Sequence, residues 1–305
     1  MVYAPIVIFA FNRIDSLAAC IKALQANTES SLSDLIIYVD GPRKDRQGEV
    51  EKVDAVRAFV KKITGFRSLT YHFSDANKKL GPSIISGVTE VINQYGSAIV
   101  LEDDLICGRN FLSFINQALA LYQNCPEVFS VCGYTNIVQI PKDYSYDAYY
   151  CPRSSSWGWA TWKDRWDSCD WELNHWDEVK KNANAFNKWG GSDCYGMLYD
   201  WKRGRNQSWA IRFCYSQFVQ GKVSLFPVIS HIDNEGFDGS GTNCKKWSRY
   251  KFIMDLSDNK NFRFPQKVIK NEKILQEFLR YYSIPMRAYS RIMYIIYDIK
   301  SLLNR

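Results

Sequence analysis

Apolar positions in the first half of the chain follow two alternating patterns. Continuous apolar runs, which are typical of strands buried on both faces, predict strands at Ile6–Phe11 and Ala98–Leu101. Further strands are predicted at Leu35–Val39, Leu69–Phe73 and Val128–Cys132. The segments between these runs repeat apolar residues every three or four positions, as one face of a helix does. Strands that alternate with helices through short connections form a parallel or mostly parallel sheet. We therefore expect an α/β fold whose ligands bind beyond the carboxyl ends of the strands.

Start signals place the helices of this first half. Helices are predicted after a cap at Asp15 or Ser16, around Glu49–Lys62, from Pro82 onward and at Phe111–Tyr122. Leu17, Cys20, Ile21 and Leu24 share one face of the first of these helices, and we expect that face to be buried.

The second half of the chain is patterned differently. Tyr146–Trp209 holds nine of the ten tryptophans and shows little periodicity, which predicts short helices and long loops over the ligand edge of the sheet. Leu225–Ile229 is predicted as a late strand, and the glycine-rich Asn234–Asn243 as a mobile loop. From Lys270 the chain becomes helical, basic and aromatic, with a break at Pro285.

The last helix allows two interpretations, which are compatible along different faces. Its apolar stripe lies opposite charged residues, so it packs on the domain. Alternatively, it rests on anionic lipid as an interfacial helix. The stripe is Tyr289, Met293, Ile296 and Leu303, the opposite face is Arg287, Arg291 and Asp298, and the residues that favour lipid are Arg280, Tyr281, Tyr282 and Tyr294.

Composition and charge narrow the class of protein. With 46% hydrophobic and 23% charged residues, the chain is not disordered, collagenous or a disulfide scaffold. A net charge of +7 suits an anionic partner such as a nucleotide, a phosphate, an acidic lipid or a nucleic acid, and does not choose among them. The nine cysteines form no CxxC pair, which predicts reduced core thiols. Without a membrane-spanning run or a secretory signal, we expect a cytoplasmic protein.

Three consecutive acids, Glu102, Asp103 and Asp104, follow the predicted strand Ala98–Leu101 directly. Carboxylates at the end of a buried strand need a compensating cation, because burying them unpaired is costly. Hard oxygen ligands suit Mn²⁺ or Mg²⁺ bound together with a phosphate group. A solvated acidic turn is the simpler interpretation of an isolated acidic pair, but the buried strand before this triplet favours the metal site.

The exit of the first strand supplies the second candidate feature. Ala10, Asn12 and Arg13 lie where this strand leads into a helix N-terminus, which attracts anions. Asp40 ends the next strand, at the same edge of a parallel sheet, and can accept a hydrogen bond from a base or a ribose. Neither a GxGxxG fingerprint nor a P-loop is present.

Several segments together resemble a known family. They are FAFNR, VDGPRK, NKKLGPSIISGVTEVINQYGSAIVLEDDLICGRNFLSFINQAL, VCGYTN and SWGWATWKDRW. From about residue 3 to residue 244 the chain resembles GT-A glycosyltransferases, in particular the eukaryotic N-acetylglucosaminyltransferases that begin complex N-glycans and their bacterial surface-polysaccharide relatives. The resemblance implies a GT-A (Rossmann-like) sheet and three segments: a nucleotide-sugar-binding half at 1–135, an acceptor-binding and catalytic half at 136–261, and a basic helical segment at 262–305.

The same resemblance implies roles for individual residues. Asp104 would ligate Mn²⁺, Asp103 would reach the ribose side of the donor, and Glu102 would contact the donor. Asp40 would match the uracil-binding Asp of the family, and Arg13 its donor-binding basic residue. Apart from the resemblance, the Trp-rich segment itself suggests an acceptor pocket. Trp157, Trp159 and Trp162 would stack on sugar rings, Trp209 is a further acceptor candidate, and Arg153 would meet a donor or acceptor phosphate. Core packing is the alternative for most of these tryptophans.

One departure from the family concerns the catalytic base. The eukaryotic enzymes carry an Asp directly after a Trp, whereas Ala210 follows Trp209 here. A positioned base contributes a rate factor of about 10²–10⁴. Replacement candidates are Asp233, Glu235 and Asp238, in or beside the glycine-rich loop, although such residues also cap turns. A retaining mechanism, which needs no base opposite the leaving group, stays open.

These observations lead to one leading function and three alternatives. The leading hypothesis is a metal-dependent glycosyltransferase that moves a sugar from a UDP-sugar to a glycan hydroxyl, with a lipid-linked acceptor at the inner membrane face. A sugar-1-phosphate nucleotidyltransferase is disfavoured because no Gly-rich, Arg-containing loop follows the first strand. A non-catalytic carbohydrate-binding protein is suggested by Ala210 alone. Nucleic-acid binding is disfavoured because the positive charge is spread along the chain.

Overall fold

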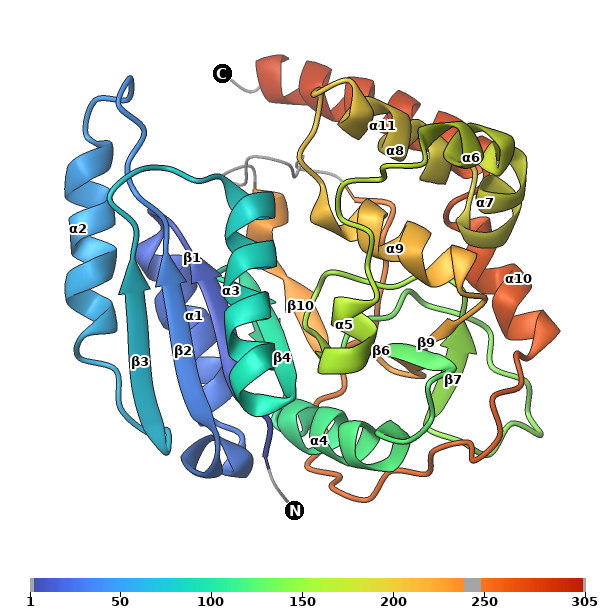
Figure 1. Cartoon of the computed structure of the whole chain (residues 1–305), viewed down its shortest axis with the longest axis horizontal. Coiled ribbons are helices and arrows are strands. Elements are labelled where there is room, and N and C mark those ends of the chain that lie inside the picture. Colours follow the sequence, from blue (N-terminus) through green and yellow to red (C-terminus); the bar gives the residue numbers. More distant parts are fainter. Residues whose placement is uncertain (1–2, 239–247, 304–305) are drawn as a thin grey trace.

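The fold centres on an eight-stranded sheet with the order β3-β2-β1-β4-β8-β6-β9-β7 (Figure 1). The computed structural model describes residues 3–238 and 248–303. Strands β1 to β4 are parallel, β6 and β9 are parallel to each other, and β8 and β7 are antiparallel to their neighbours. The strands are β1 (Ile6–Ala10), β2 (Asp34–Val39), β3 (Ser68–Phe73), β4 (Ser97–Glu102), β6 (Val128–Cys132), β7 (Ala148–Cys151), β8 (Trp159–Trp162) and β9 (Val223–Pro227).

Helices cover both faces of this sheet. Along β1, Ile6, Ile8 and Ala10 contact one face's apolar cluster, while Val7 and Phe9 contact the other. The first cluster includes α1, α2 and α4, and the second includes α3 and α9, because the side chains of a strand alternate between its two faces. The helices of the sheet layer are α1 (Ile14–Gln25), α2 (Glu49–Val60), α3 (Leu80–Tyr95), α4 (Phe111–Tyr122) and α9 (Trp209–Val219). The predicted α/β class, with a mostly parallel sheet flanked by helices, is confirmed.

The Trp-rich stretch differs from its prediction in one respect. Short helices are present, but β7 and β8 are strands of the main sheet rather than loops over its edge. β8 lies between β4 and β6 and is antiparallel to both. As an interior strand of the sheet, it has four buried residues. The short helices are α5 (Lys163–Asp167), α6 (Trp176–Lys181), α7 (Ala183–Gly190) and α8 (Cys194–Lys202).

A small second sheet joins two distant parts of the chain. Strand β5 (Leu105–Cys107) follows the acid triplet, and β10 (Ile232–Asn234) pairs with it in an antiparallel arrangement. The short 3₁₀ helix η2 (Glu235–Asp238) follows β10 directly, and another, η1 (Thr28–Leu32), follows α1. The first residues of the predicted glycine-rich loop are therefore ordered against β5, whereas residues 239–243 lie outside the described part.

The C-terminal segment forms two helices, α10 (Glu272–Arg280) and α11 (Ile284–Leu303). Ile274 and Phe278 of α10 are buried against Tyr149 and Phe226 of the main sheet. Pro285 lies in the first turn of α11, where its missing N–H costs nothing, so the predicted break falls just before it. Within the described residues, none of the helices has the length and apolar character needed to span a bilayer. The described cysteines are free thiols, of which six are buried and two, Cys125 and Cys169, are half-buried.

Candidate functional site

The acid triplet lies at the carboxyl edge of the sheet. β4 ends at Glu102, and Asp103 and Asp104 form the turn between β4 and β5. Asp103 is 3% exposed and Asp104 8% exposed, so both carboxylates are buried. Phe9 of β1 is paired with Glu102, which brings the exit of β1 beside the triplet, as the parallel pattern predicted.

Arg13 joins these two elements. It occupies the N-cap position of α1, and its Nη2 donates to Asp103 Oδ1 and, at 3.0 Å, to Asp104 Oδ2. The backbone N–H of Phe11 donates to the other Asp103 oxygen at 3.4 Å. Arg13 Nη1 is buried and has no hydrogen-bond partner among the described residues. A buried donor without a partner is costly, and an anion bound at this edge would satisfy it.

The electrostatics of the triplet favour a cation. Burial raises the pKa of Glu102 to about 8, and the charges of Asp104 and Asp103 raise it further. Burial also raises the pKa of Asp103 to about 6, although Arg13 opposes this. Two carboxylates, those of Asp103 and Asp104, thus share one guanidinium, and their hard oxygens are the donors that Mn²⁺ and Mg²⁺ prefer. Among the described residues, no group of three His, Cys, Asp or Glu side chains is placed to hold a metal ion. The two aspartates therefore fit a divalent cation whose remaining ligands are phosphate oxygens of a bound molecule and water.

The segment after β10 covers Asp104. The backbone N–H of Glu235 donates to the Asp104 carbonyl at 3.1 Å, and Gly236 N–H donates to Asn234 Oδ1 at 2.8 Å. A Cβ built on Gly236 would lie 2.5 Å from Asp104 Oδ2, so this position accepts no side chain without displacement of the carboxylate. The structure thus brings η2, and with it two of the three predicted base candidates, against the triplet.

The Gly236 contact leads to a direct prediction. A Gly236→Ala variant forces Asp104 or η2 to move by several tenths of an ångström, and we expect the activity that depends on Asp104 to fall about tenfold or more, since positioning errors near 1 Å cost about 10²-fold. Gly196→Ala is the matched control, because a Cβ there meets nothing within 4 Å. Turnover measured for both variants checks this, and equal turnover would contradict the tight contact.

The base candidates differ in their surroundings. Glu235 is exposed, whereas Asp233 is half-buried, and burial raises the pKa of its carboxyl group. Asp238 lies in η2, but its side chain is outside the described set. Ala210 lies in the first turn of α9 and packs on the apolar cluster beneath α3. That helix is capped by Ser208, whose hydroxyl accepts from Ile211 N–H.

Asp40 stabilises the loop before α3 through hydrogen bonds to the backbone. Its carboxylate accepts hydrogen bonds from the backbone N–H groups of Gly41, Lys78 and Lys79 at 2.9, 2.8 and 3.0 Å. Lys79 has a φ of 67°, a strained conformation for a non-glycine residue, just before α3 begins. Asp40 therefore orders the loop that leads into α3 at the same sheet edge. Uracil binding by this residue stays a prediction.

Sequence reasoning missed the partners of Asn12. Its amide donates to Glu49 Oε1 at 3.2 Å, and Arg43 bonds the same carboxylate through its backbone N–H and its guanidinium. These hydrogen bonds from Arg43 lower the pKa of Glu49. The guanidinium carbon of Arg43 lies 5.4 Å from the ring centre of Phe11. The sequence signal that could have predicted this cluster is Arg43, which lies six residues before Glu49 at the start of the predicted helix.

The four predicted acceptor residues do not form one surface. Trp159 and Trp209 are 1% and 4% exposed and stack at 4.7 Å in the core, so they take the packing role. Arg153 is buried, pairs with Asp193 at 2.7 Å, and lies over the Tyr282 ring. Trp157 is only partly buried and packs edge-on against Tyr134 at 4.4 Å.

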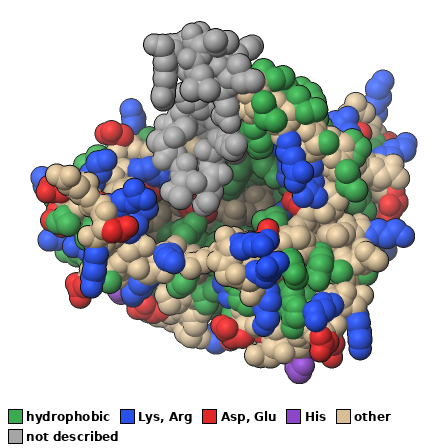
Figure 2. Space-filling view, turned by 90° about the horizontal axis from the view of Figure 1, so that it is seen from above, with side chains coloured by type: hydrophobic (Ala, Val, Ile, Leu, Met, Phe, Trp, Pro, Cys, Tyr) green, Lys and Arg blue, Asp and Glu red, His purple; other side chains and the backbone are tan. Residues whose placement is uncertain are grey.

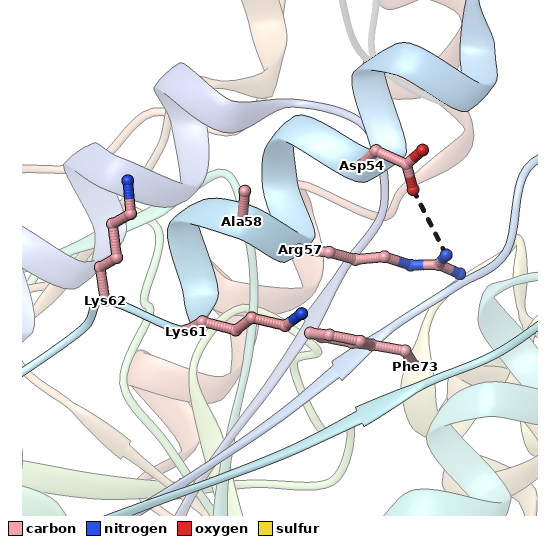
Figure 3. A pocket seen from close by; sticks show the side chains of 6 residues that line it. All are labelled: Asp54, Arg57, Ala58, Lys61, Lys62 and Phe73. Atoms are coloured by element: carbon pink, nitrogen blue, oxygen red, sulfur yellow. Dashed lines mark hydrogen bonds and ion pairs between the residues drawn. The ribbon is translucent and has the colours of Figure 1, made fainter.

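A concavity of about 500 Å³ lies between α2 and β3, lined by residues other than the triplet (Figure 3). Arg57 and Lys61 lie over the ring of Phe73, at 5.5 and 5.7 Å, and Arg57 donates to the Ser74 carbonyl at 2.6 Å. Asp54, paired with Arg57, is the acid at its rim. None of the predicted site residues lines this concavity.

The fold and the site define an α/β protein with a buried acid triplet and an arginine at the carboxyl edge of a mostly parallel sheet. Known proteins add little to this description. Neither a family model nor a curated protein matches the chain. The similar solved structures include a mannosyltransferase from Pyrobaculum calidifontis in complex with GDP-Man and Mn²⁺, at 11% identity over 53% of this chain and 46% of that one, with a TM-score of 0.33. They also include TarS of S. aureus, at 11% identity over 51% and 28% of the two chains, with a TM-score of 0.32. This chain thus spans less than half the length of either protein, and at these TM-scores the likeness supports no functional argument.

Proposed function

We propose that the chain is a glycosyltransferase of the GT-A type, which transfers a sugar from a nucleotide-sugar to a hydroxyl group of a glycan. One observation supports this most directly: Arg13, whose buried Nη1 has no hydrogen-bond partner in the described part of the chain, lies against the carboxylates of Asp103 and Asp104 at the carboxyl edge of the sheet. A guanidinium with a free donor and a carboxylate that suits a divalent cation are the two partners that a diphosphate requires. The segment-by-segment resemblance to GT-A enzymes supports the same reaction.

Each residue then has a role in donor binding. Asp104, with Asp103 beside it, would hold Mn²⁺ or Mg²⁺; when bound, this ion supplies Lewis-acid stabilisation of the leaving diphosphate. Arg13 donates from Nη1 to a phosphate oxygen while Nη2 keeps the two aspartates in place. Glu102 and Asp103 face the ribose side, and Asp40, Asn12 and the backbone at Ala10 flank the base, which we propose to be uracil.

The acceptor side rests on η2 and Trp157. We propose Glu235 as the base that removes the proton from the attacking hydroxyl, because its side chain is exposed and its backbone is bonded to Asp104. Asp233 and Asp238 are the alternatives on the same segment. Trp157 is proposed as the sugar platform, and a lipid-linked glycan of bacterial surface polysaccharide synthesis as the acceptor.

A panel of nucleotide-sugars tests the function. Thermal unfolding and release of nucleoside diphosphate are measured with UDP-, GDP- and dTDP-sugars, each with and without Mn²⁺. We expect UDP-sugars with Mn²⁺ to raise the unfolding temperature most, since ligand at about 100 times its Kd stabilises by about 2.7 kcal/mol. Slow UDP release, accelerated by a suitable glycan, is expected as well.

Other outcomes of this panel would favour other functions. Formation of a nucleotide-sugar from a nucleoside triphosphate and a sugar phosphate would identify a nucleotidyltransferase. Glycan binding without any stabilisation by nucleotide-sugars would identify a non-catalytic carbohydrate-binding protein. Either result would overturn the proposed transfer reaction.

A further inference from the structure

Helix α11 is fixed to the body of the protein along one side. Arg287 donates to the Ser192 carbonyl at 2.8 Å and to its hydroxyl at 3.1 Å, and Ser290 is 2% exposed. Just before the helix, Tyr281 and Tyr282 are buried, and the hydroxyl of Tyr281 donates to the Ile137 carbonyl at 2.8 Å. These two tyrosines, which the sequence associated with lipid, therefore anchor the helix instead.

The opposite side of α11 is apolar and exposed. Ile284, Ile292 and Ile295 are 70%, 57% and 59% exposed. At about 100° per residue these three positions, with Ala288 and Ile296, span an arc of about 120° around the helix axis. The arc contains no charged residue. A helix face on a water-soluble domain is normally polar, so an apolar arc of this width marks an interaction surface.

The charges near this arc are mostly positive. From Arg280 to Tyr297 the chain has three arginines and no acidic residue, and α11 then continues with one acid, Asp298, and one base, Lys300. Arg291 is exposed at the border of the arc, about 20° from Ile284 on the helical wheel. Apolar side chains bordered by arginine complement the anionic headgroups and acyl chains of a bilayer surface.

The position of α11 suits a flat partner. In Figure 1 the helix runs along the top of the molecule, toward which the strands β2 and β3 also point. Figure 2, seen from above, shows hydrophobic side chains beside Lys and Arg on this face. The carboxyl edge of the sheet and α11 therefore face the same side.

We propose that α11 docks in the plane of an anionic lipid bilayer, with Ile284, Ile292 and Ile295 inserted among the acyl chains and Arg291 at the phosphate groups. An amphipathic helix binds in this orientation, parallel to the membrane plane with its apolar face at the boundary between headgroups and acyl chains. The proposal rests on α11 alone, and it holds whether or not the chain transfers sugars.

Sedimentation of the full chain with vesicles tests the proposal. Phosphatidylcholine vesicles are compared with vesicles that also contain about 30% phosphatidylglycerol, an anionic lipid. We expect binding to the anionic vesicles only, and weaker binding when salt rises from about 0.1 M to about 1 M, because the Debye length falls from about 10 to about 3 Å.

Two variants and one control make the test specific. Combined Ile284→Ser, Ile292→Ser and Ile295→Ser substitutions should lower the partition coefficient by about 100-fold or more, since three buried side chains are lost. Combined Val219→Ser, Leu256→Ser and Ile269→Ser substitutions, at positions 54%, 82% and 70% exposed outside α11, should leave it unchanged. Arg291→Glu should weaken binding at low salt and should not disturb folding.

Four results would overturn the proposal. The first three are absent binding of the wild-type chain to anionic vesicles, equal binding by the α11 variant and the wild type, and an equal loss of binding in the control variant. The fourth is that the wild-type chain does not bind vesicles but forms a dimer without lipid, as measured by sedimentation equilibrium, and that the α11 variant is monomeric. This result would show that the apolar arc contacts a second copy of the chain. If the triple variant fails to fold, Arg291→Glu and the salt series still decide.

Discussion

An Asp104→Asn variant is expected to lose at least about 10³-fold in sugar transfer, because several kcal/mol of charge stabilisation at the leaving diphosphate are removed. The amide keeps the shape of the carboxylate and can still accept from Arg13. It also relieves the repulsion that raises the pKa of Glu102. Thermal stability without ligand should therefore be retained while Mn²⁺ binding is lost. Release of nucleoside diphosphate and calorimetric titration with Mn²⁺ measure the two effects.

The control for this variant is Asp54→Asn. Asp54 is an acid on α2, exposed and weakly paired with Arg57 at 3.5 Å, and its removal should change neither turnover nor metal binding. Undiminished turnover in Asp104→Asn would refute the metal assignment. If the variant loses turnover but still binds Mn²⁺, Asp104 is not the metal ligand, although it still belongs to the donor site.

A Glu235→Gln variant is expected to lower kcat by about 10²–10⁴-fold, the usual contribution of a positioned base. Because the backbone N–H of Glu235, rather than its side chain, bonds to Asp104, donor binding should be unaffected. The thermal shift caused by the nucleotide-sugar should therefore equal that of the wild type. Steady-state kinetics at saturating donor measure the change in kcat.

Asp233→Asn and Asp238→Asn are the matched variants for this comparison. Asp233 is half-buried on β10, so its replacement should have a smaller effect on kcat. If kcat is unchanged in Glu235→Gln but reduced in Asp233→Asn or Asp238→Asn, the aspartate whose replacement lowers kcat is the base. Full activity in all three would favour a mechanism without a base on this segment, such as retention.

Strands β1, β2, β4 and β6 were predictable because they are mostly buried on both faces and mostly apolar in sequence. The edge strand β3 has only half-buried and exposed residues and lacks this signal. β1, β2 and β4 differ from their predicted ranges by only one or two residues, and α4 has the predicted bounds. β7 and β8 were not predictable in this way. Each has four residues within an aromatic stretch without periodicity, and only their pairing with distant strands makes them strands.

The candidate site, too, was predictable where contacts follow from parallel strand order, and not where they depend on pairing between distant segments. The meeting of Arg13 with Asp103 followed from topology, because both lie at carboxyl ends of neighbouring parallel strands. The contact of Gly236 with Asp104 depends on the β5–β10 pairing, which joins residues about 130 positions apart and has no local signature. Trp159 was expected to contact a sugar because it lies in a Trp-rich segment. It belongs to β8, an interior strand of the sheet, and is therefore buried.

The insertion of β8 between β4 and β6 has a practical consequence for dissecting this protein. A fragment that ends near residue 135 would contain β4 and β6 but would lack the strand that separates them, so both would present bare backbone to solvent. Such a fragment is expected to aggregate rather than bind nucleotide. The proposed donor and acceptor halves therefore have to be produced as a single polypeptide, and exchanging one of them for another sequence requires moving β8 together with the strands that flank it.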